Sequence, residues 1–113
     1  MKNIIFVLLV SSVFLNAGEV DNTLKKQCQY WIYGNGKSNT VYESFLYGVA
    51  AGTYYNTEKN DRSKKCESSY STIAELGCKE ALNDNSTESF SNKVNWGIAV
   101  TCNNKYAKYS KLK

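Results

Sequence analysis

Four cysteines and no proline, in a chain of 113 residues, most constrain what this sequence can fold into. Without proline, no predicted helix contains a residue that lacks a backbone N–H and clashes with the preceding turn. The even number of cysteines predicts two disulfides, because no histidine or C-x-x-C pair accompanies them to hold a metal ion. The cysteines are Cys28, Cys66, Cys78 and Cys102. We therefore expect an oxidised, helical domain without a metal site.

The first 17 residues have the pattern of a signal peptide. Lys2 supplies a positive start, residues 4–15 are apolar, and small residues allow cleavage after Ala17. About twelve apolar residues are too few for a membrane-spanning helix, which needs roughly twenty. We expect a signal peptide over residues 1–17 and one soluble domain over residues 18–113, periplasmic or secreted, with no stable membrane insertion.

Charge and histidine content argue against two classes of function. Without Lys2, 13 of the 14 basic residues remain against 10 acidic ones, a formal charge of +3. These charges are scattered, whereas nucleic-acid binders concentrate basic residues on one face. The commonest catalytic triads need a histidine base, which this chain lacks. We expect no nucleic-acid partner, no cofactor and no catalytic residue; Glu80 is the most plausible carboxylate for any enzymatic role.

Apolar residues at helical spacing, separated by polar segments, predict four helices. A strand over residues 98–101 is the rival interpretation, but such an isolated strand would have no partner. We predict an all-α fold, a small four-helix bundle stapled by two disulfides, with a flexible basic tail from about residue 104 to 113. The expected helices cover residues 21–33, 41–55, 72–82 and 88–102.

Local signals mark where two of these helices begin and where the first ends. Thr40 with Glu43, and Thr72 with Glu75, have the spacing of a capping box, in which each side chain binds a free amide of the other residue. Two glycines within residues 34–36 favour left-handed backbone and predict the end of the first helix.

The second predicted helix contains Gly48 and Gly52, next to an apolar stripe that consists of Val41, Phe45, Leu46, Val49 and Ala50. Each glycine costs a helix up to about 1 kcal/mol relative to alanine. Close approach of another helix is the expected compensation. The alternative is that the small residues leave room for a ligand or for a side chain of a partner.

Four cysteines allow three pairings, and the sequence alone does not choose among them. If the third and fourth helices form an antiparallel hairpin, the chain before the third helix meets the end of the fourth. This geometry favours Cys66 with Cys102 and leaves Cys28 with Cys78. Closing a loop of about 36 residues contributes roughly 3 to 4 kcal/mol in the chain-entropy model.

Nine tyrosines and two tryptophans are a heavy aromatic load for this length. Rings on the helices are expected to fill the small core. Rings at helix ends, in loops and in the tail are harder to explain by packing, and tyrosine is enriched at protein interfaces. The tyrosines in such positions are Tyr54, Tyr55, Tyr70, Tyr106 and Tyr109. They predict a surface for a protein partner.

Residues 45–52, with the sequence FLYGVAAG, are followed by Cys66, a helix, and a second helix that ends at Cys102. This order of features, over residues 45–102, resembles the Rap/Tai family of immunity proteins. Those small exported helical proteins neutralise peptidoglycan amidase effectors delivered by type VI secretion. In contrast to the family pattern, no proline follows Cys66, and the chain adds Cys28 and Cys78.

The resemblance implies a periplasmic binding protein that inhibits a peptidoglycan amidase effector by occluding its active site, and it implies a homodimer. From their position and expected exposure, the polar loop over residues 56–65 and the turn over residues 83–87 are the segments that would contact the effector. The candidate contact residues are Tyr54, Tyr55, Asn56, Glu58, Lys59, Asp61 and Asn85. The alternative is a small periplasmic structural or stress protein that binds clients or envelope components without a toxin partner.

Overall fold

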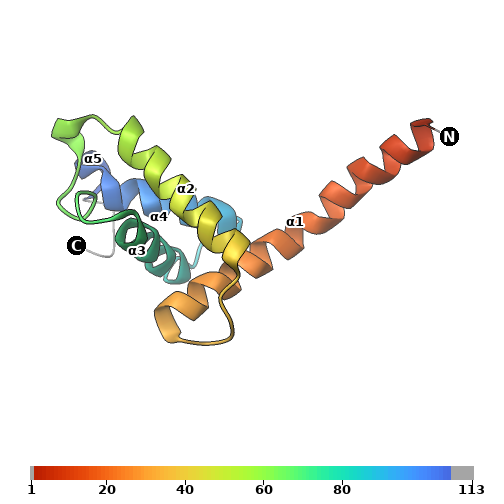
Figure 1. The fold of residues 1–113 in the computed structure, drawn as a ribbon, viewed down its shortest axis with the longest axis horizontal. Coiled ribbons are helices and arrows are strands. Elements are labelled where there is room, and N and C mark those ends of the chain that lie inside the picture. Colours follow the sequence, from red (N-terminus) through yellow and green to blue (C-terminus); the bar gives the residue numbers. More distant parts are fainter. Residues whose placement is uncertain (1, 108–113) are drawn as a thin grey trace.

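The computed structural model describes the backbone of residues 2–107 and the side chains of residues 18–106. Figure 1 shows its helices. Helices α3 and α4 form a hairpin, and α2 lies against the outer side of this hairpin. The described residues form no strand and have one isolated bridge, between Arg62 and Asn103. The predicted all-α fold with four principal helices is confirmed. The helices are α1 (Lys2–Tyr33), α2 (Thr40–Asn56), η1 (Lys59–Asp61), α3 (Tyr70–Leu82), α4 (Phe90–Cys102) and α5 (Asn104–Ala107).

Helix α1 is longer than predicted, because it begins at Lys2 and not at residue 21. No proline interrupts it, so the helix continues through the predicted leader. Its first half extends away from the other helices (Figure 1), whereas Leu24 and Cys28 are buried in the bundle. Cleavage after Ala17 remains a prediction. Among the described residues, no helix is both long and apolar enough to cross a membrane.

The end of α1 follows the sequence prediction. Gly34 and Gly36 have φ angles of 73° and 79°, in the left-handed region that favours glycine. The loop that they begin is attached to α1 by the buried side chain of Gln27. Its amide nitrogen donates to the Ser38 hydroxyl at 3.3 Å, and its amide oxygen accepts from the Asn39 backbone. This attachment places the start of α2 beside α1.

The capping box predicted for α2 is wrong, because Asn39 caps the helix in place of Thr40. The Asn39 side chain accepts hydrogen bonds from the amides of Val41 and Tyr42 at 3.1 and 3.2 Å. Asparagine is a better N-cap than threonine, so the helix begins one residue earlier. The Glu43 carboxylate instead accepts a hydrogen bond from the Ser38 hydroxyl at 2.8 Å.

Serines cap α3 and α4 in a similar way. The Ser69 hydroxyl accepts from the amide of Thr72 at 3.1 Å, so Thr72 lies inside α3 and the predicted box with Glu75 is wrong. The Ser89 hydroxyl accepts from the amide of Asn92 at 3.2 Å, and α4 begins two residues later than predicted. In both helices the cap is the serine directly before the first helical residue.

Helices α3 and α4 come into backbone contact at Gly77 and Gly97, both of which are buried. A Cβ on Gly77 would lie 3.0 Å from the Ile98 amide nitrogen, and a Cβ on Gly97 would lie 3.1 Å from the Gly77 Cα. Backbone atoms of each helix therefore occupy the space where the other would carry a side chain. Only glycine at these two positions allows the helices to approach so closely.

Both predicted disulfides are present. Cys28 of α1 is joined to Cys78 of α3, with Cα atoms 5.1 Å apart, and Cys66 is joined to Cys102 of α4, with Cα atoms 4.4 Å apart. All four side chains are buried within the core. Apart from the cysteines, the core consists of Leu24, Leu46, Ala50, Ile73, Ala74, Ala81, Val94 and Ile98.

The expectation that another helix packs on Gly48 and Gly52 is wrong for the described part of this chain. Both glycines are exposed, and an added Cβ would meet no heavy atom within 4 Å. The apolar stripe predicted beside these glycines is buried only in part. Its members Leu46 and Ala50 are buried in the core, as predicted, whereas Val41 and Phe45 are 75% and 49% exposed.

Part of the predicted flexible tail is helical. Residues Asn104–Ala107 form α5, in which the Tyr106 ring lies 5.4 Å from the ring of Trp96. Residues 108–113, including Tyr109, lie outside the described part of the chain.

An aspartate of α1 provides a second cap for α4. The carboxylate of Asp21 accepts hydrogen bonds from the amides of Phe90 and Ser91 at 3.1 and 3.2 Å, and from the Ser91 hydroxyl at 2.6 Å. A negative charge at this position also interacts favourably with the helix dipole. The Ser91 hydroxyl, aided by both amides, holds the pKa of Asp21 below its usual range despite partial burial.

We predict opposite effects of alanine at two kinds of glycine. Gly77→Ala should lower the free energy of unfolding by about 1–3 kcal/mol, because its Cβ overlaps backbone atoms of α4. Gly48→Ala is the matched control and should raise it by about 0.5–1 kcal/mol, because its Cβ enters open space within a helix. Urea denaturation of the oxidised protein measures both. Equal effects of the two variants would contradict the assignment of the close contact.

We predict that Asp21→Asn lowers the free energy of unfolding by about 1–2 kcal/mol at pH 7, through loss of a charged cap. The folded-state pKa is lowered, so this contribution is present above the unfolded pKa of about 4 and is lost as pH falls through the folded pKa. The difference between wild type and variant should therefore shrink in acid. Denaturation curves from pH 7 to pH 2 measure it, and a constant difference would contradict the charge effect.

Candidate functional site

A cleft of about 470 Å³ opens where the end of α2 meets the segment leading into α3. Its wall combines aromatic rings with hydroxyl groups and one carboxylate. We refer to it as the tyrosine cleft. The residues that line it are Tyr54, Tyr55, Cys66, Glu67, Ser68, Ser69 and Tyr70.

Three tyrosine rings pack in edge-to-face and tilted arrangements at this cleft. The ring centroids of Tyr54 and Tyr55 are 5.2 Å apart at an interplanar angle of 88°, and Tyr70 lies 5.8 Å from Tyr54 and 6.3 Å from Tyr55. Such tilted arrangements are the favoured ones for aromatic pairs. Tyr55 is 71% exposed and Tyr70 36% exposed, so both rings present surface to solvent. Hydrogen bonding with Tyr55 raises the pKa of the Tyr70 phenol above its ordinary value.

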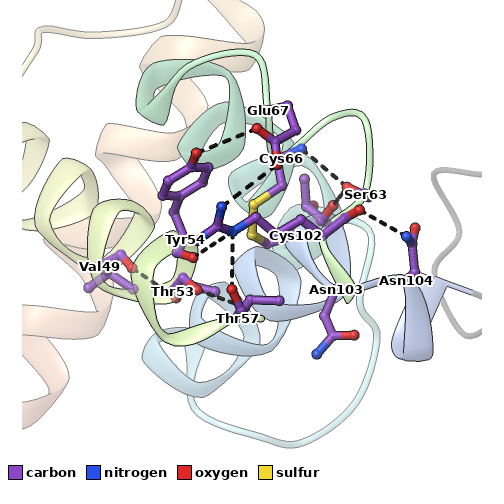
Figure 2. Close-up of a disulfide and its surroundings, with 12 residues drawn as sticks. Val49, Thr53, Tyr54, Thr57, Ser63, Cys66, Glu67, Cys102, Asn103 and Asn104 are labelled. Carbon is purple, nitrogen blue, oxygen red and sulfur yellow. Dashed lines mark hydrogen bonds and ion pairs between the residues drawn. A yellow bond between two sulfur atoms is a disulfide. The ribbon is translucent and has the colours of Figure 1, made fainter. Parts of the chain in front are cut away.

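Arg62 holds the Tyr54 side of the cleft in place. Its Nε donates to the carbonyl oxygens of Tyr54 and Thr57, both at 3.0 Å, and so binds the last carbonyls of α2. The guanidinium carbon lies 3.9 Å from the centroid of the Tyr54 ring, within cation–π distance. On the other side, the guanidinium pairs with Glu67 at 3.9 Å. The Tyr54 hydroxyl donates to the same Glu67 carboxylate at 3.4 Å (Figure 2).

The segment that carries Arg62 is fixed to the end of α4, as Figure 2 shows. The Ser63 amide donates to the Cys102 carbonyl at 2.8 Å, and the side chain of Asn104 donates to the Arg62 carbonyl at 2.9 Å. The Ser63 hydroxyl also donates to the Thr101 carbonyl. Together with the bond between Cys66 and Cys102, these contacts hold one wall of the cleft against α4.

The structure places six of the seven predicted contact residues together. Tyr54, Tyr55 and Asn56 form the last turn of α2, and Glu58, Lys59 and Asp61 follow in and beside η1. Asp61 forms an ion pair with Lys105 at 3.2 Å, which joins η1 to α5. Glu58 and Lys59 are exposed.

Asn85 does not belong to this group. It is exposed in the turn between α3 and α4, and each of these helices has 13 residues, about 20 Å of length. The tyrosine cleft lies at the opposite end of the α3–α4 hairpin. Near the turn is a second hollow of about 250 Å³, lined by Asp84, Glu88, Asn92, Lys93 and Trp96.

Sequence reasoning missed Arg62 and Glu67, and it treated residues 56–65 as a plain exposed loop. Thr57 and Ser63 are buried, and η1 lies between them. One signal was available, because Arg62 is the single arginine in a chain with 13 lysines. Only the planar guanidinium group reaches two carbonyl oxygens, an aromatic face and a carboxylate together.

The arrangement is suited to binding. Aromatic rings, hydroxyl groups and one half-exposed carboxylate offer apolar area together with hydrogen-bonding groups.

Glu80 is only 7% exposed and is packed against Gly97, far from this surface. In the part of the chain that the structure describes, no three His, Cys, Asp or Glu residues gather as potential metal ligands.

Comparison with family models, with curated proteins and with solved structures gives no match. The resemblance to the Rap/Tai family therefore remains a prediction from residues 45–102.

We predict that Arg62→Lys lowers the free energy of unfolding by about 1–3 kcal/mol, because lysine keeps the charge and loses the planar donor group. The near-ultraviolet circular dichroism of the tyrosines should change as well, since Tyr54 loses the group stacked on its ring. Lys59→Gln, at an exposed position three residues earlier, is the control and should change stability by less than about 0.5 kcal/mol. Unchanged stability and spectrum in Arg62→Lys would contradict the role assigned to Arg62.

Proposed function

We propose that this chain is an exported binding protein that holds a protein partner in the tyrosine cleft and acts as a stoichiometric inhibitor. The observation that carries the proposal is the cleft itself: Tyr55 and Tyr70 stay exposed on a wall that is fixed by Arg62 and by the Cys66–Cys102 bond. Tyrosine and arginine are enriched where binding energy is concentrated in protein interfaces.

Rigidity of the cleft supports an inhibitor in particular. A ring that is already held in one orientation loses little conformational entropy when it is buried against a partner. The contacts that hold Tyr54 involve its ring, its hydroxyl and its backbone carbonyl, as described above. Such a preformed surface suits tight one-to-one binding.

The partner that we propose is a peptidoglycan amidase effector, on the basis of the Rap/Tai resemblance over residues 45–102. The exposed residues Asn56, Glu58 and Lys59 follow Tyr55 of the cleft along the chain, and in this proposal they enter the substrate groove of the enzyme. Blocking that groove inhibits the enzyme without any chemical step by this chain. Export and location in the periplasm are part of this proposal.

We predict that Tyr55→Ser combined with Tyr70→Ser raises the concentration needed for half inhibition at least tenfold. The assay measures peptidoglycan hydrolysis by a purified peptidoglycan amidase effector of type VI secretion, titrated with the oxidised protein. The control is Tyr33→Ser, because Tyr33 is 57% exposed at the end of α1, near the start of α2. It should inhibit like wild type, and circular dichroism should show that all variants fold.

Two outcomes would overturn different parts of the proposal. If wild-type protein at stoichiometric amounts leaves the amidase fully active, the amidase is not the partner, and the alternative of a structural or stress protein is favoured. If wild type inhibits and the double tyrosine variant inhibits equally well, the tyrosine cleft is not the contact surface.

A further inference from the structure

The hollow of about 250 Å³ near the turn between α3 and α4 has no part in the proposed inhibition. Its wall combines one large aromatic ring with two carboxylates, one carboxamide and one ammonium group. The residues that line it are Asp84, Glu88, Asn92, Lys93 and Trp96. We refer to it as the Trp96 hollow. It shares no residue with the tyrosine cleft, so the two surfaces can be tested separately.

The indole of Trp96 gives this hollow an exposed aromatic surface. Tryptophan is highly buried in most proteins, whereas Trp96 is 45% exposed. The ring of Tyr106, in α5, packs against the indole with centroids 5.4 Å apart at an angle of 56°. Such a ring attracts the C–H groups of a ligand by dispersion and through its negative π-surface. Trp96 is therefore a supported platform for a flat ligand.

Hydrogen bonds hold the polar groups around this platform in place. The Lys93 ammonium donates to the Asp84 carbonyl at 2.9 Å, and the Asn92 side chain donates to the Glu88 carboxylate at 3.2 Å. An ammonium has three N–H donors, and a carboxamide has two N–H donors and an oxygen acceptor. Lys93 and Asn92 therefore keep further hydrogen-bonding groups for a ligand. Asn92 lies one turn before Trp96 on α4, so both are on the same side of the helix.

We propose that the Trp96 hollow binds the ring of an uncharged sugar. The C–H groups of a pyranose ring stack on the indole of Trp96, while its hydroxyl groups exchange hydrogen bonds with Glu88, Asn92 and Lys93. A hydroxyl group both donates and accepts, so it can pair with a carboxylate, a carboxamide or an ammonium group. At about 250 Å³ the hollow is smaller than the pockets of drug-sized ligands, which are about 300–1,000 Å³. This size favours a single ring over an extended peptide.

The charges of the wall distinguish an uncharged sugar from other ring ligands. Lys93 offsets one of the two carboxylates, so the wall attracts a cation only weakly. The remaining negative charge repels an acidic sugar. A purely apolar ring would remove water from these charged groups and offer no hydrogen bond in return. An uncharged ring that carries hydroxyl groups avoids all three costs.

Sugar binding here does not depend on the proposed inhibition. A chain that holds a glycan in the Trp96 hollow keeps the rings of Tyr55 and Tyr70 available to a protein partner. Sugar binding without amidase inhibition would leave the Trp96 hollow in place and overturn the proposed function alone. Inhibition without sugar binding would overturn the Trp96 hollow alone.

NMR titration of the isotope-labelled, oxidised protein with methyl β-glucoside and with N-acetylglucosamine tests the site. The chain has two tryptophans, and the Trp96→Ala variant assigns their indole N–H signals. The Trp96 signal should shift saturably with a dissociation constant on the order of 1 mM, as expected for a ligand of one ring. Trp31, whose ring centroid lies 5.6 Å from that of Tyr47, is the internal reference and should not shift. Methyl glucuronide should bind at least tenfold more weakly.

Three variants separate the ring, the charge and the position. Trp96→Ala should raise the dissociation constant of methyl β-glucoside at least tenfold, measured from the backbone amide signals of residues 88–93. Glu88→Gln keeps the size of the side chain and removes its charge, so it should reduce the preference for glucoside over glucuronide. Tyr55→Ser removes an exposed ring outside the hollow and should bind sugar like wild type. Circular dichroism should show that all three variants fold.

Several results would overturn the proposal. If the Trp96 signal does not shift with either uncharged sugar up to about 50 mM, far above the expected constant, the hollow is not a sugar site. Equal affinity for methyl glucuronide would overturn the uncharged sugar as its ligand. Equal binding by Trp96→Ala would overturn the stacking role of the indole.

Cosedimentation with insoluble peptidoglycan distinguishes the source of the sugar. Retention of wild type that Trp96→Ala loses would identify a polysaccharide strand as the ligand. Binding to the soluble sugars without such retention would identify a free sugar.

Discussion

The contact between Gly77 of α3 and Gly97 of α4 is the constraint on which the rest of the structure depends. It brings two helices together with backbone against backbone, and it forms the hairpin on which α1 and α2 pack. Cys78 follows Gly77 directly and holds α1, while Cys102 ends α4 and holds the segment before α3. A small shift of the hairpin would therefore displace both disulfides together.

Each disulfide adds one segment that the hairpin alone would not hold. Loops of about 50 and 36 residues are closed, and each bond contributes roughly 4 kcal/mol in the chain-entropy model. The bond between Cys28 and Cys78 secures α1, whose Asp21 then caps α4. The bond between Cys66 and Cys102 secures the segment in which Arg62 fixes the last turn of α2. This second chain of contacts holds Tyr54, against which the rings of the exposed Tyr55 and Tyr70 pack.

Much of the fold could be predicted from the sequence, because helix periodicity, the lack of proline and an antiparallel hairpin determine the helices and the cysteine pairs. The predicted helix starts were wrong where several neighbouring polar residues could cap the helix. Asn39 and Ser69 are the N-caps of α2 and α3, in place of Thr40 and Thr72. Periodicity predicted the apolar stripe of α2 that contains the buried Leu46 and Ala50, but it did not show that the neighbouring Gly48 is uncovered or that Gly77 makes the close helix contact. The tyrosines of the candidate site were predicted from their positions, whereas Arg62 depends on contacts between distant segments.

Hydrogen exchange of two disulfide variants tests most directly whether the α3–α4 hairpin is the platform and the Cys66–Cys102 bond fixes the cleft to it. Cys66→Ala with Cys102→Ala should speed exchange of the Ser63 and Cys66 amides, which donate to the Cys102 carbonyl and the Ser63 hydroxyl, while amides in the middle of α3 and α4 stay protected. The double variant with Cys28→Ala and Cys78→Ala should leave exchange of the Ser63 and Cys66 amides unchanged and should speed exchange of the amides in α1. If losing Cys66 and Cys102 leaves the exchange of Ser63 unchanged, or exposes α3 and α4 first, the account is contradicted.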